Sequence, residues 1–286
     1  MQFWVIQTLN SLALGGVLFL LSAGFSLIFG LMRIANLTHG ALFMLGAYLG
    51  ATILKFVPNL WLAALAGGLA VALFGGLIER FILRKLAGNV LGQVLVTLGI
   101  AYIIADFCLV TWGGDPIPIP TPASLQAPFR AFGFAFPAYR LAVVVIAVLV
   151  AVALYFLMEK TRLGAMIRAG VDDMEMARAV GIPVSRLFTI VFCLGAGLAG
   201  AGGVIGGPIM SAYPGLDADM LPLALIVVIL GGVGSLVGAF LGSFITGFVY
   251  TFGVALLPQL AYVILFLPMI FVIAFRPRGL FGKFAA

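Results

Sequence analysis

The chain has 286 residues, of which 64% are hydrophobic and only 8% are charged, and its mean hydropathy is +1.28. Soluble domains average roughly 45–50% apolar and about 25% charged residues, so this composition excludes a soluble globular protein. The net charge of +6 comes from basic residues spread over several short loops. That distribution argues against a nucleic-acid-binding patch and is typical of a membrane protein with basic cytoplasmic loops.

The apolar runs are continuous and lack the alternation of barrel strands, which predicts an all-α polytopic membrane protein with about eight to ten transmembrane helices. In chain order the expected spans are 4–31, 37–53, 60–78, 91–112, 139–158, 187–205, 220–230, 236–257 and 260–275. The first is long enough to be a tilted or broken helix. Residues 220–257 form either two full spans or a re-entrant pair that turns at the glycines of 231–235. Residues 1–286 are expected to form a single transmembrane domain.

The loops predict the orientation of the chain. Residues 113–137 are rich in Pro and Gly, which indicates an ordered extracytoplasmic loop without regular helix. With nine spans, the basic residues at 80–85, at 160–186 and at the C-terminus all fall on one side, which is therefore expected to be cytoplasmic. The N-terminus is then outside and the C-terminus is cytoplasmic. No basic residue precedes the first apolar run, so no cleavable signal peptide is expected.

Other signals are better explained by structure than by chemistry. Cys108 and Cys193 lie inside apolar runs without metal-ligand spacing, so neither a disulfide nor a metal site is expected. The residues Gly195–Gly200 match the dinucleotide-binding pattern GxGxxG, but their flanks are membrane helix, and close helix packing explains them better. The chain has no HExxH or GxSxG motif and no paired acids on a span, which argues against an intramembrane enzyme.

Nine charged residues are concentrated in the segment 159–186. Within it, Asp172 and Glu175 have the spacing of a capping box, and Gly181 followed by Pro183 provides a C-terminal stop, so a short helix is predicted over 173–180. A second short helix is predicted over 162–169, bracketed by Thr161 and Gly170. The simplest interpretation is a solvated loop between two spans. However, apolar residues without a core of their own are mixed with these charges, and such a surface fits a groove of another protein; they are Met166, Ile167, Met174, Met176 and Val180.

Three segments, in this order and spacing, resemble the LivH-type permease subunits of ATP-binding-cassette (ABC) importers for branched-chain amino acids. They are Gly30-Leu31-Met32-Arg33-Ile34-Ala35-Asn36-Leu37-Thr38-His39-Gly40 through Gly46; Thr161-Arg162-Leu163-Gly164 with Arg168-Ala169 and Ala179-Val180-Gly181-Ile182; and Gly231-Gly232-Val233-Gly234-Ser235 through Gly238 and Gly242. The resemblance extends over about residues 5 to 278.

The resemblance implies a bacterial-type inner (plasma) membrane permease that works with a homologous second permease, two cytoplasmic ATP-binding subunits and an extracytoplasmic solute-binding protein. The chain has no Walker A pattern, so ATP is expected to be bound and hydrolysed by the partner subunits, and this chain is expected to be neither an enzyme nor a cofactor-binding protein. The segment 159–186 would be the element that couples to the ATPase. Its candidate coupling residues are Arg162, Arg168, Asp172, Met174, Glu175, Met176, Arg178 and Gly181.

Four residues are candidates for the substrate pathway. Asn36, Thr38 and His39 form a polar cluster where the second span begins, beside Gly40, and such a cluster suits a helix break. A lone histidine often has a structural role, capping or bridging backbone groups, and that alternative stays open for His39. Asp106 is an acid inside a predicted span, which makes it either a substrate contact or a solvated group near the outer interface.

Asp106 also bears on the substrate, because similar permeases often carry an amide at this position. The resemblance implies a small amino acid, branched-chain or related, as the default substrate. Because the acid departs from the family pattern, urea, short amides or other small organic solutes stay open as the alternative. An autonomous channel for a small solute is a further alternative, but it would not need the mixed apolar and charged helical pair within 159–186.

Overall fold

The computed structural model describes residues 2–32, 36–131 and 134–282. The α-helices are α1 (Gln2–Met32), α2 (Thr38–Phe56), α3 (Leu60–Phe81), α4 (Val90–Trp112), α5 (Ala138–Lys160), α6 (Arg162–Asp172), α7 (Met174–Ala179), α8 (Val184–Met210), α9 (Leu216–Gly231), α10 (Leu236–Leu256) and α11 (Ala261–Phe275). Three short 3₁₀ turns are η1 (Leu83–Leu86), η2 (Ala123–Leu125) and η3 (Pro258–Leu260). Strands β1 (Pro128–Ala131) and β2 (Phe134–Pro137) pair antiparallel.

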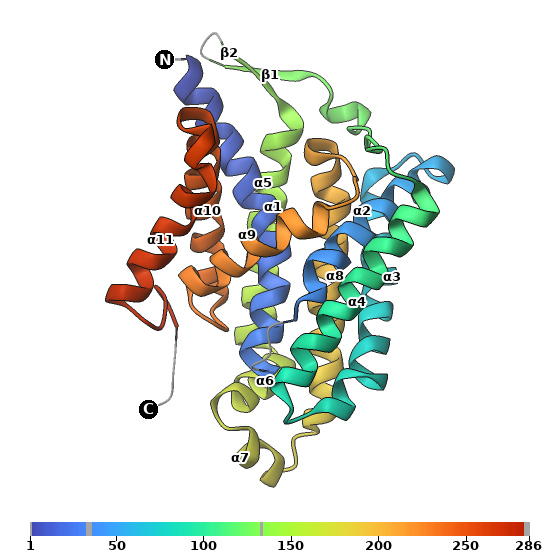
Figure 1. Ribbon diagram of the computed structural model, residues 1–286, viewed down its shortest axis with the longest axis vertical. Helices are drawn as coiled ribbons and strands as arrows, with labels where there is room; N and C mark the ends of the chain where they lie inside the picture. Colours follow the sequence, from blue (N-terminus) through green and yellow to red (C-terminus); the bar gives the residue numbers. More distant parts are fainter. Residues whose placement is uncertain (1, 33–35, 132–133, 283–286) are drawn as a thin grey trace.

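The prediction of an all-α polytopic membrane protein is confirmed. Within the described residues, seven helices are long and apolar enough to cross a membrane, namely α1, α2, α3 with η1, α4, α5, α8 and α10. The 16-residue α9 and the 15-residue α11 are shorter apolar helices that complete the bundle. Figure 1 shows the N-terminus and the β1–β2 hairpin at one end of the bundle, called here the hairpin end, and α6 and α7 at the other, called here the α7 end.

Helix α8 is at the centre of the bundle and packs through glycines. A Cβ atom on Gly24 of α1 would collide with the backbone of Gly195, and one on Gly46 of α2 would collide with the backbone of Gly200. A Cβ on Gly75 of α3 would lie 2.6 Å from the Cβ of Ala196. The GxGxxG-like stretch is therefore a packing surface, as its membrane-helix context predicted.

Several boundaries differ from the sequence predictions. Helix α1 is continuous over 31 residues, about 46 Å at 1.5 Å per residue, so it is not broken. Helix α8 was expected to end near residue 205 but continues through Pro208 to Met210, because a proline in the last turn removes only one helical hydrogen bond. The loop 113–137 contains the β1–β2 hairpin, and its Ile117 pairs with Ala212 beyond α8.

Helix α9 runs obliquely across the bundle in Figure 1, towards a turn that packs against the last part of α1. A Cβ atom on Gly30 of α1 would lie 2.6 Å from the Cα of Gly234 in that turn. After α11 the chain returns to the same turn, where Leu280 and Phe281 donate backbone hydrogen bonds to Leu230 and Gly231. For residues 220–257, the sequence allowed either two full spans or a re-entrant pair. The structure has the oblique helix α9 followed by the long helix α10.

Candidate functional site

Helix α2 begins inside the bundle. His39, in its first turn, lies level with Leu21, which is 11 residues before the end of α1 at Met32. At 1.5 Å per residue, that is about 16 Å from the end of α1 and so near the middle of a hydrocarbon layer about 30 Å thick. The helix break predicted from the polar cluster is therefore at membrane depth, where it is surrounded by protein.

The start of α2 is fixed to α4 by Thr97. The hydroxyl of Thr38 donates to the carbonyl oxygen of Thr97 at 2.8 Å, and the backbone N–H of Leu37 donates to the Thr97 hydroxyl at 3.3 Å. The side-chain oxygen of Asn36 accepts a hydrogen bond from the backbone N–H of Thr38 at 3.2 Å. The side chains of Asn36, Thr38 and Thr97 are all buried. These bonds satisfy backbone groups that a helix start leaves without intrahelical partners.

His39 connects α2 to α1. Its Nε2 lies 2.9 Å from the carbonyl oxygen of Leu21, and because a carbonyl only accepts, Nε2 carries the hydrogen. The centroid of the imidazole ring lies 5.2 Å from the ring centroid of Phe25, and the His39 side chain is fully buried. The structural alternative, in which the imidazole bridges backbone groups at a broken helix, describes this contact directly.

Asp106 lies apart from this cluster. The buried face of α4 carries Thr97, Ala101, Ile104 and Cys108, whereas Asp106 is on the exposed face with Tyr102, Ile103, Phe107 and Val110. The structure thus brings Asn36, Thr38 and His39 together and leaves Asp106 on an outer surface of the chain. Its role as a pathway residue then requires a partner that covers this face.

The segment 159–186 forms two short helices, as predicted, with shifted boundaries. The hydroxyl of Thr161 accepts from the N–H of Gly164 and caps α6, which continues to Asp172 and not only to residue 169. The prediction that Asp172 caps the second helix is wrong. Asp173 is the cap, because it has extended backbone and its carboxylate accepts from the N–H groups of Glu175 and Met176 at 3.0 and 2.9 Å.

The C-terminal stop of α7 is as predicted. Gly181 has φ +88°, a left-handed conformation that favours glycine. The backbone N–H groups of Gly181 and Ile182 donate to the carbonyl oxygens of Arg178 and Ala177, both at 3.0 Å, which is the Schellman arrangement.

The candidate coupling residues fall into two groups. Arg162, Glu175, Met176 and Arg178 are exposed, with Met174 half-buried beside Arg178. Arg168, which is half-buried, and Asp172, which is exposed, line a cavity between α6 and the rest of the bundle. The exposed apolar residues Met176 and Val180 are 60% and 69% exposed, so α7 presents an apolar surface beyond the bundle.

Sequence reasoning missed a buried ionic network near α7. Glu79, which directly follows the expected span 60–78, is in the last turn of α3 and is fully buried. Its carboxylate accepts from Arg84 at 3.0 Å and from the hydroxyl of Thr189 in α8 at 2.6 Å, and Arg84 also donates to the carbonyl oxygen of Ser185. The sequence shows that Glu79 and Arg84 are five residues apart. It does not show that both contact residues of α8. Thr97 was missed as well, although it is a hydroxyl residue within an otherwise apolar span.

A second hollow lies at the hairpin end between α1, α5, α8 and α10. It has a volume of about 380 Å³ and includes Asn10, Arg140, Met210 and Tyr213 in its lining. Arg140 donates a hydrogen bond to the side chain of Asn10. No sequence pattern singled out these residues, which come from distant parts of the chain.

The seven long apolar helices, the helix start at membrane depth and the polar helical pair between two long spans define a polytopic membrane protein of the kind that includes many transporters. The chain matches the family model described as the branched-chain amino acid transport system / permease component over residues 7–273. It therefore belongs to that family, which confirms the resemblance found in the sequence.

The curated relatives of the chain carry names that match this family. The chain is 28% identical over 292 residues to the high-affinity branched-chain amino acid transport system permease protein BraD of Pseudomonas aeruginosa, covering 97% of this chain and 95% of the relative. It is 25% identical over 298 residues to the corresponding permease protein LivH of Escherichia coli K12, covering 98% and 96%. A probable LivH permease of Methanocaldococcus jannaschii is 28% identical over 243 residues, covering 78% and 74%. No solved structure matches the chain.

Proposed function

We propose that this chain is the permease subunit of an ABC importer that carries branched-chain amino acids, delivered by a solute-binding protein, across an inner membrane. The observation that carries the proposal is the full-length match to branched-chain amino acid permeases, combined with the projecting pair α6–α7. The partners are a homologous second permease and two cytoplasmic ATP-binding subunits, which bind and hydrolyse the ATP.

The orientation follows from charge. Basic residues gather at the α7 end, in η1 and its flanks and in the segment from α5 to α8, so this end is cytoplasmic. They are Arg80, Arg84, Lys85, Lys160, Arg162, Arg168, Arg178 and Arg186. The hairpin end with the N-terminus then faces the outside, and the C-terminus is cytoplasmic.

The surface that contacts the ATP-binding subunit is α7 with its flanking turns. Met176 and Val180 are exposed apolar residues. They belong to α7 and its flanking turn, at the end of the bundle opposite the hairpin (Figure 1). Asp173 and Gly181 fix both ends of the helix, so α7 presents these side chains in a defined arrangement. A short, rigid, partly apolar helix of this kind fits a groove of another protein.

The second permease covers the exposed face of α4. An ionisable group on a lipid-facing surface is costly, so Asp106 requires water or a protein partner beside it. A pathway between the two permeases provides both. In this arrangement Asp106 faces the substrate pathway, and the cluster of Asn36, Thr38 and His39 supports the wall behind it through α2 and Thr97.

The test is transport by the reconstituted complex. The chain is coexpressed with candidate permease and ATP-binding subunits, copurified and placed in proteoliposomes with the solute-binding protein. We expect ATP-dependent uptake of leucine, isoleucine or valine. Uptake of urea or a short amide in preference to these would replace the substrate assignment, and uptake without any ATP-binding subunit would indicate an autonomous channel.

A further inference from the structure

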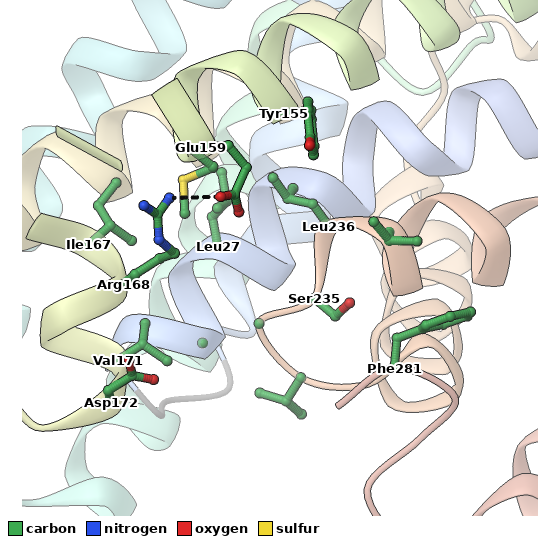
Figure 2. Close-up of a pocket in the computed structure, with 15 residues that line it drawn as sticks. Leu27, Tyr155, Glu159, Ile167, Arg168, Val171, Asp172, Ser235, Leu236 and Phe281 are labelled. Atoms are coloured by element: carbon green, nitrogen blue, oxygen red, sulfur yellow. Dashed lines mark ion pairs between the residues drawn. The ribbon is translucent and has the colours of Figure 1, made fainter. Parts of the chain in front are cut away.

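A cavity of about 260 Å³ lies at the α7 end, where five parts of the chain meet. Its walls come from the end of α1, the last turns of α5, helix α6 and the turn between α9 and α10, with Phe281 from the C-terminal segment. Figure 2 shows Arg168 and Glu159 on one side of this space and Leu236, Ser235 and Phe281 across from them. The cavity therefore joins the α6–α7 pair to the helices of the bundle.

The charged groups of the cavity are incompletely paired. Arg168 Nη1 lies 3.6 Å from Glu159 Oε2, too far for a good hydrogen bond, and both side chains are partly exposed. Among the described residues, no hydrogen-bond partner is found for this buried Nη1 atom. Asp172, one turn further along α6, adds a second carboxylate to the lining. A guanidinium presents five donors, so Arg168 retains capacity to bind a carboxylate.

The rest of the lining is largely aliphatic, with Leu27, Ile167, Val171, Leu236 and Val237 among the lining residues. Drug-sized ligands occupy pockets of about 300–1,000 Å³, so a volume slightly below this range suits a smaller molecule. One cationic group, two carboxylates and an aliphatic wall match the carboxylate, the ammonium group and the side chain of an aliphatic α-amino acid. This lining suits a zwitterion with an apolar side chain.

We propose that this cavity binds an aliphatic α-amino acid from the cytoplasm and that its occupancy slows transport. The inference rests on the proposed function for the cytoplasmic position of the α7 end and for the identity of the ligand. A bound amino acid would bridge Arg168 of α6 to the wall formed by Leu236 and Val237. Because α6 is followed directly by α7, this bridge restrains the element that contacts the ATP-binding subunit, and accumulated product lowers the rate of import.

The first experiment measures binding of radiolabelled leucine to the purified complex of the permeases and ATP-binding subunits, without the solute-binding protein. We expect saturable binding that weakens by about tenfold or more in Arg168→Gln, since the charge-assisted hydrogen bond to the carboxylate is lost. Arg168→Lys should retain part of the affinity. Lys160→Gln, which removes a nearby positive charge outside the cavity lining, is the matched control and should bind like the wild type.

The chemistry of the ligand is tested in the same assay. Leucine amide lacks the carboxylate, and 4-methylpentanoate lacks the ammonium group, so both should compete poorly with leucine. Val237→Trp places a larger side chain on the opposite wall of the cavity and should abolish the Arg168-dependent binding. Saturable binding that persists unchanged in both Arg168→Gln and Val237→Trp would place the amino acid elsewhere and overturn the proposal.

The second experiment measures regulation in proteoliposomes that contain the whole importer and its solute-binding protein. Leucine loaded into the lumen, on the α7 side, should slow the initial uptake of labelled leucine by the wild type. Val237→Trp should take up leucine at the wild-type rate from an empty lumen but resist this inhibition. Normal uptake without lumenal inhibition overturns the regulatory site alone, whereas failure to take up any branched-chain amino acid overturns the proposed function itself.

Discussion

The imidazole Nε2 of His39 lies 2.9 Å from the carbonyl oxygen of Leu21, so the first turn of α2 is held to the middle of α1. His39→Ala removes this buried hydrogen bond, worth about 1 kcal/mol, and leaves a cavity beside Phe25 that adds to the loss. We expect lower thermal stability and lower uptake at equal protein level. His39→Gln, which keeps a side-chain N–H donor, should recover part of both. Wild-type uptake by His39→Ala would show that this contact is dispensable.

Gly40 is predicted to be required for the crossing of α2 and α9. A Cβ atom there would lie 2.6 Å from the carbonyl oxygen of Asp217 and 2.9 Å from the Cβ of Leu221. Gly40→Ala should therefore destabilise the protein by about 1–3 kcal/mol, as overpacking does in tight cores. The matched control is Gly99→Ala in α4, where a Cβ meets nothing within 4 Å among the described residues. In a thermal unfolding assay, that control should be neutral or slightly stabilising. Equal losses of stability in Gly40→Ala and Gly99→Ala would refute the packing argument.

The buried carboxylate of Glu79 is predicted to be essential for stability. Breaking a fully buried ion pair costs about 3–5 kcal/mol. The Arg84 side chain is 35% exposed, so water offsets part of this, and we expect Glu79→Ala to cost about 2 kcal/mol. Glu79→Gln keeps an acceptor for Thr189 and should cost less. The double variant Glu79→Ala/Arg84→Ala should unfold at a higher temperature than Glu79→Ala alone, because it leaves no unpaired charge. A lower unfolding temperature for the double variant would contradict this account.

The apolar surface of α7 is predicted to couple the permease to its ATPase. Changing both Met174 and Met176 to Asp removes apolar contacts and places charges in the proposed interface, so substrate-stimulated ATP hydrolysis should fall by about tenfold or more. Membrane insertion and most of the thermal stability should be retained, since Met176 is 60% exposed and Met174 is only half-buried in the isolated chain. Met174→Leu/Met176→Leu preserves the apolar surface and should preserve coupling. Unchanged stimulation in the Asp variant would exclude α7 as the contact.

Asp106 is predicted to influence the selectivity of uptake. Asp106→Asn keeps the shape of the side chain and removes its charge on the exposed face of α4, so the relative uptake of a panel of small solutes should change. Asp115→Asn, in the exposed loop just after α4, is the matched control and should leave the panel unchanged. Identical solute profiles for Asp106→Asn and the wild type would mean that Asp106 lies in a solvated outer interface and not in the pathway.

The sequence by itself determined the class of the protein and most of its helices. Apolar runs long enough to span a bilayer identify membrane helices because unpaired backbone groups are costly in hydrocarbon. Local signals were similarly reliable where they act within a few residues. Thr161, Gly181 and Pro183 marked the ends of α6 and α7, since caps and left-handed glycine depend on neighbouring backbone groups. Adjacent acids, Asp172 and Asp173, competed for one cap, and sequence spacing selected the wrong one.

Only the tertiary structure decided which helices meet and what lies between them. Asn36, Thr38 and His39 stood out as polar residues, but their partners, Leu21 and Thr97, act mainly through backbone carbonyls that no side-chain pattern reveals. Arg168 and Asp172 looked like an outward surface, and the fold turned them towards a cavity whose other wall comes from α10 and the C-terminal segment. The sequence left open whether Asp106 contacts substrate or solvent, because its helix is apolar on all sides. Helix periodicity in a membrane does not distinguish lipid-facing from protein-facing surfaces, since both are apolar, so these positions follow only from long-range packing.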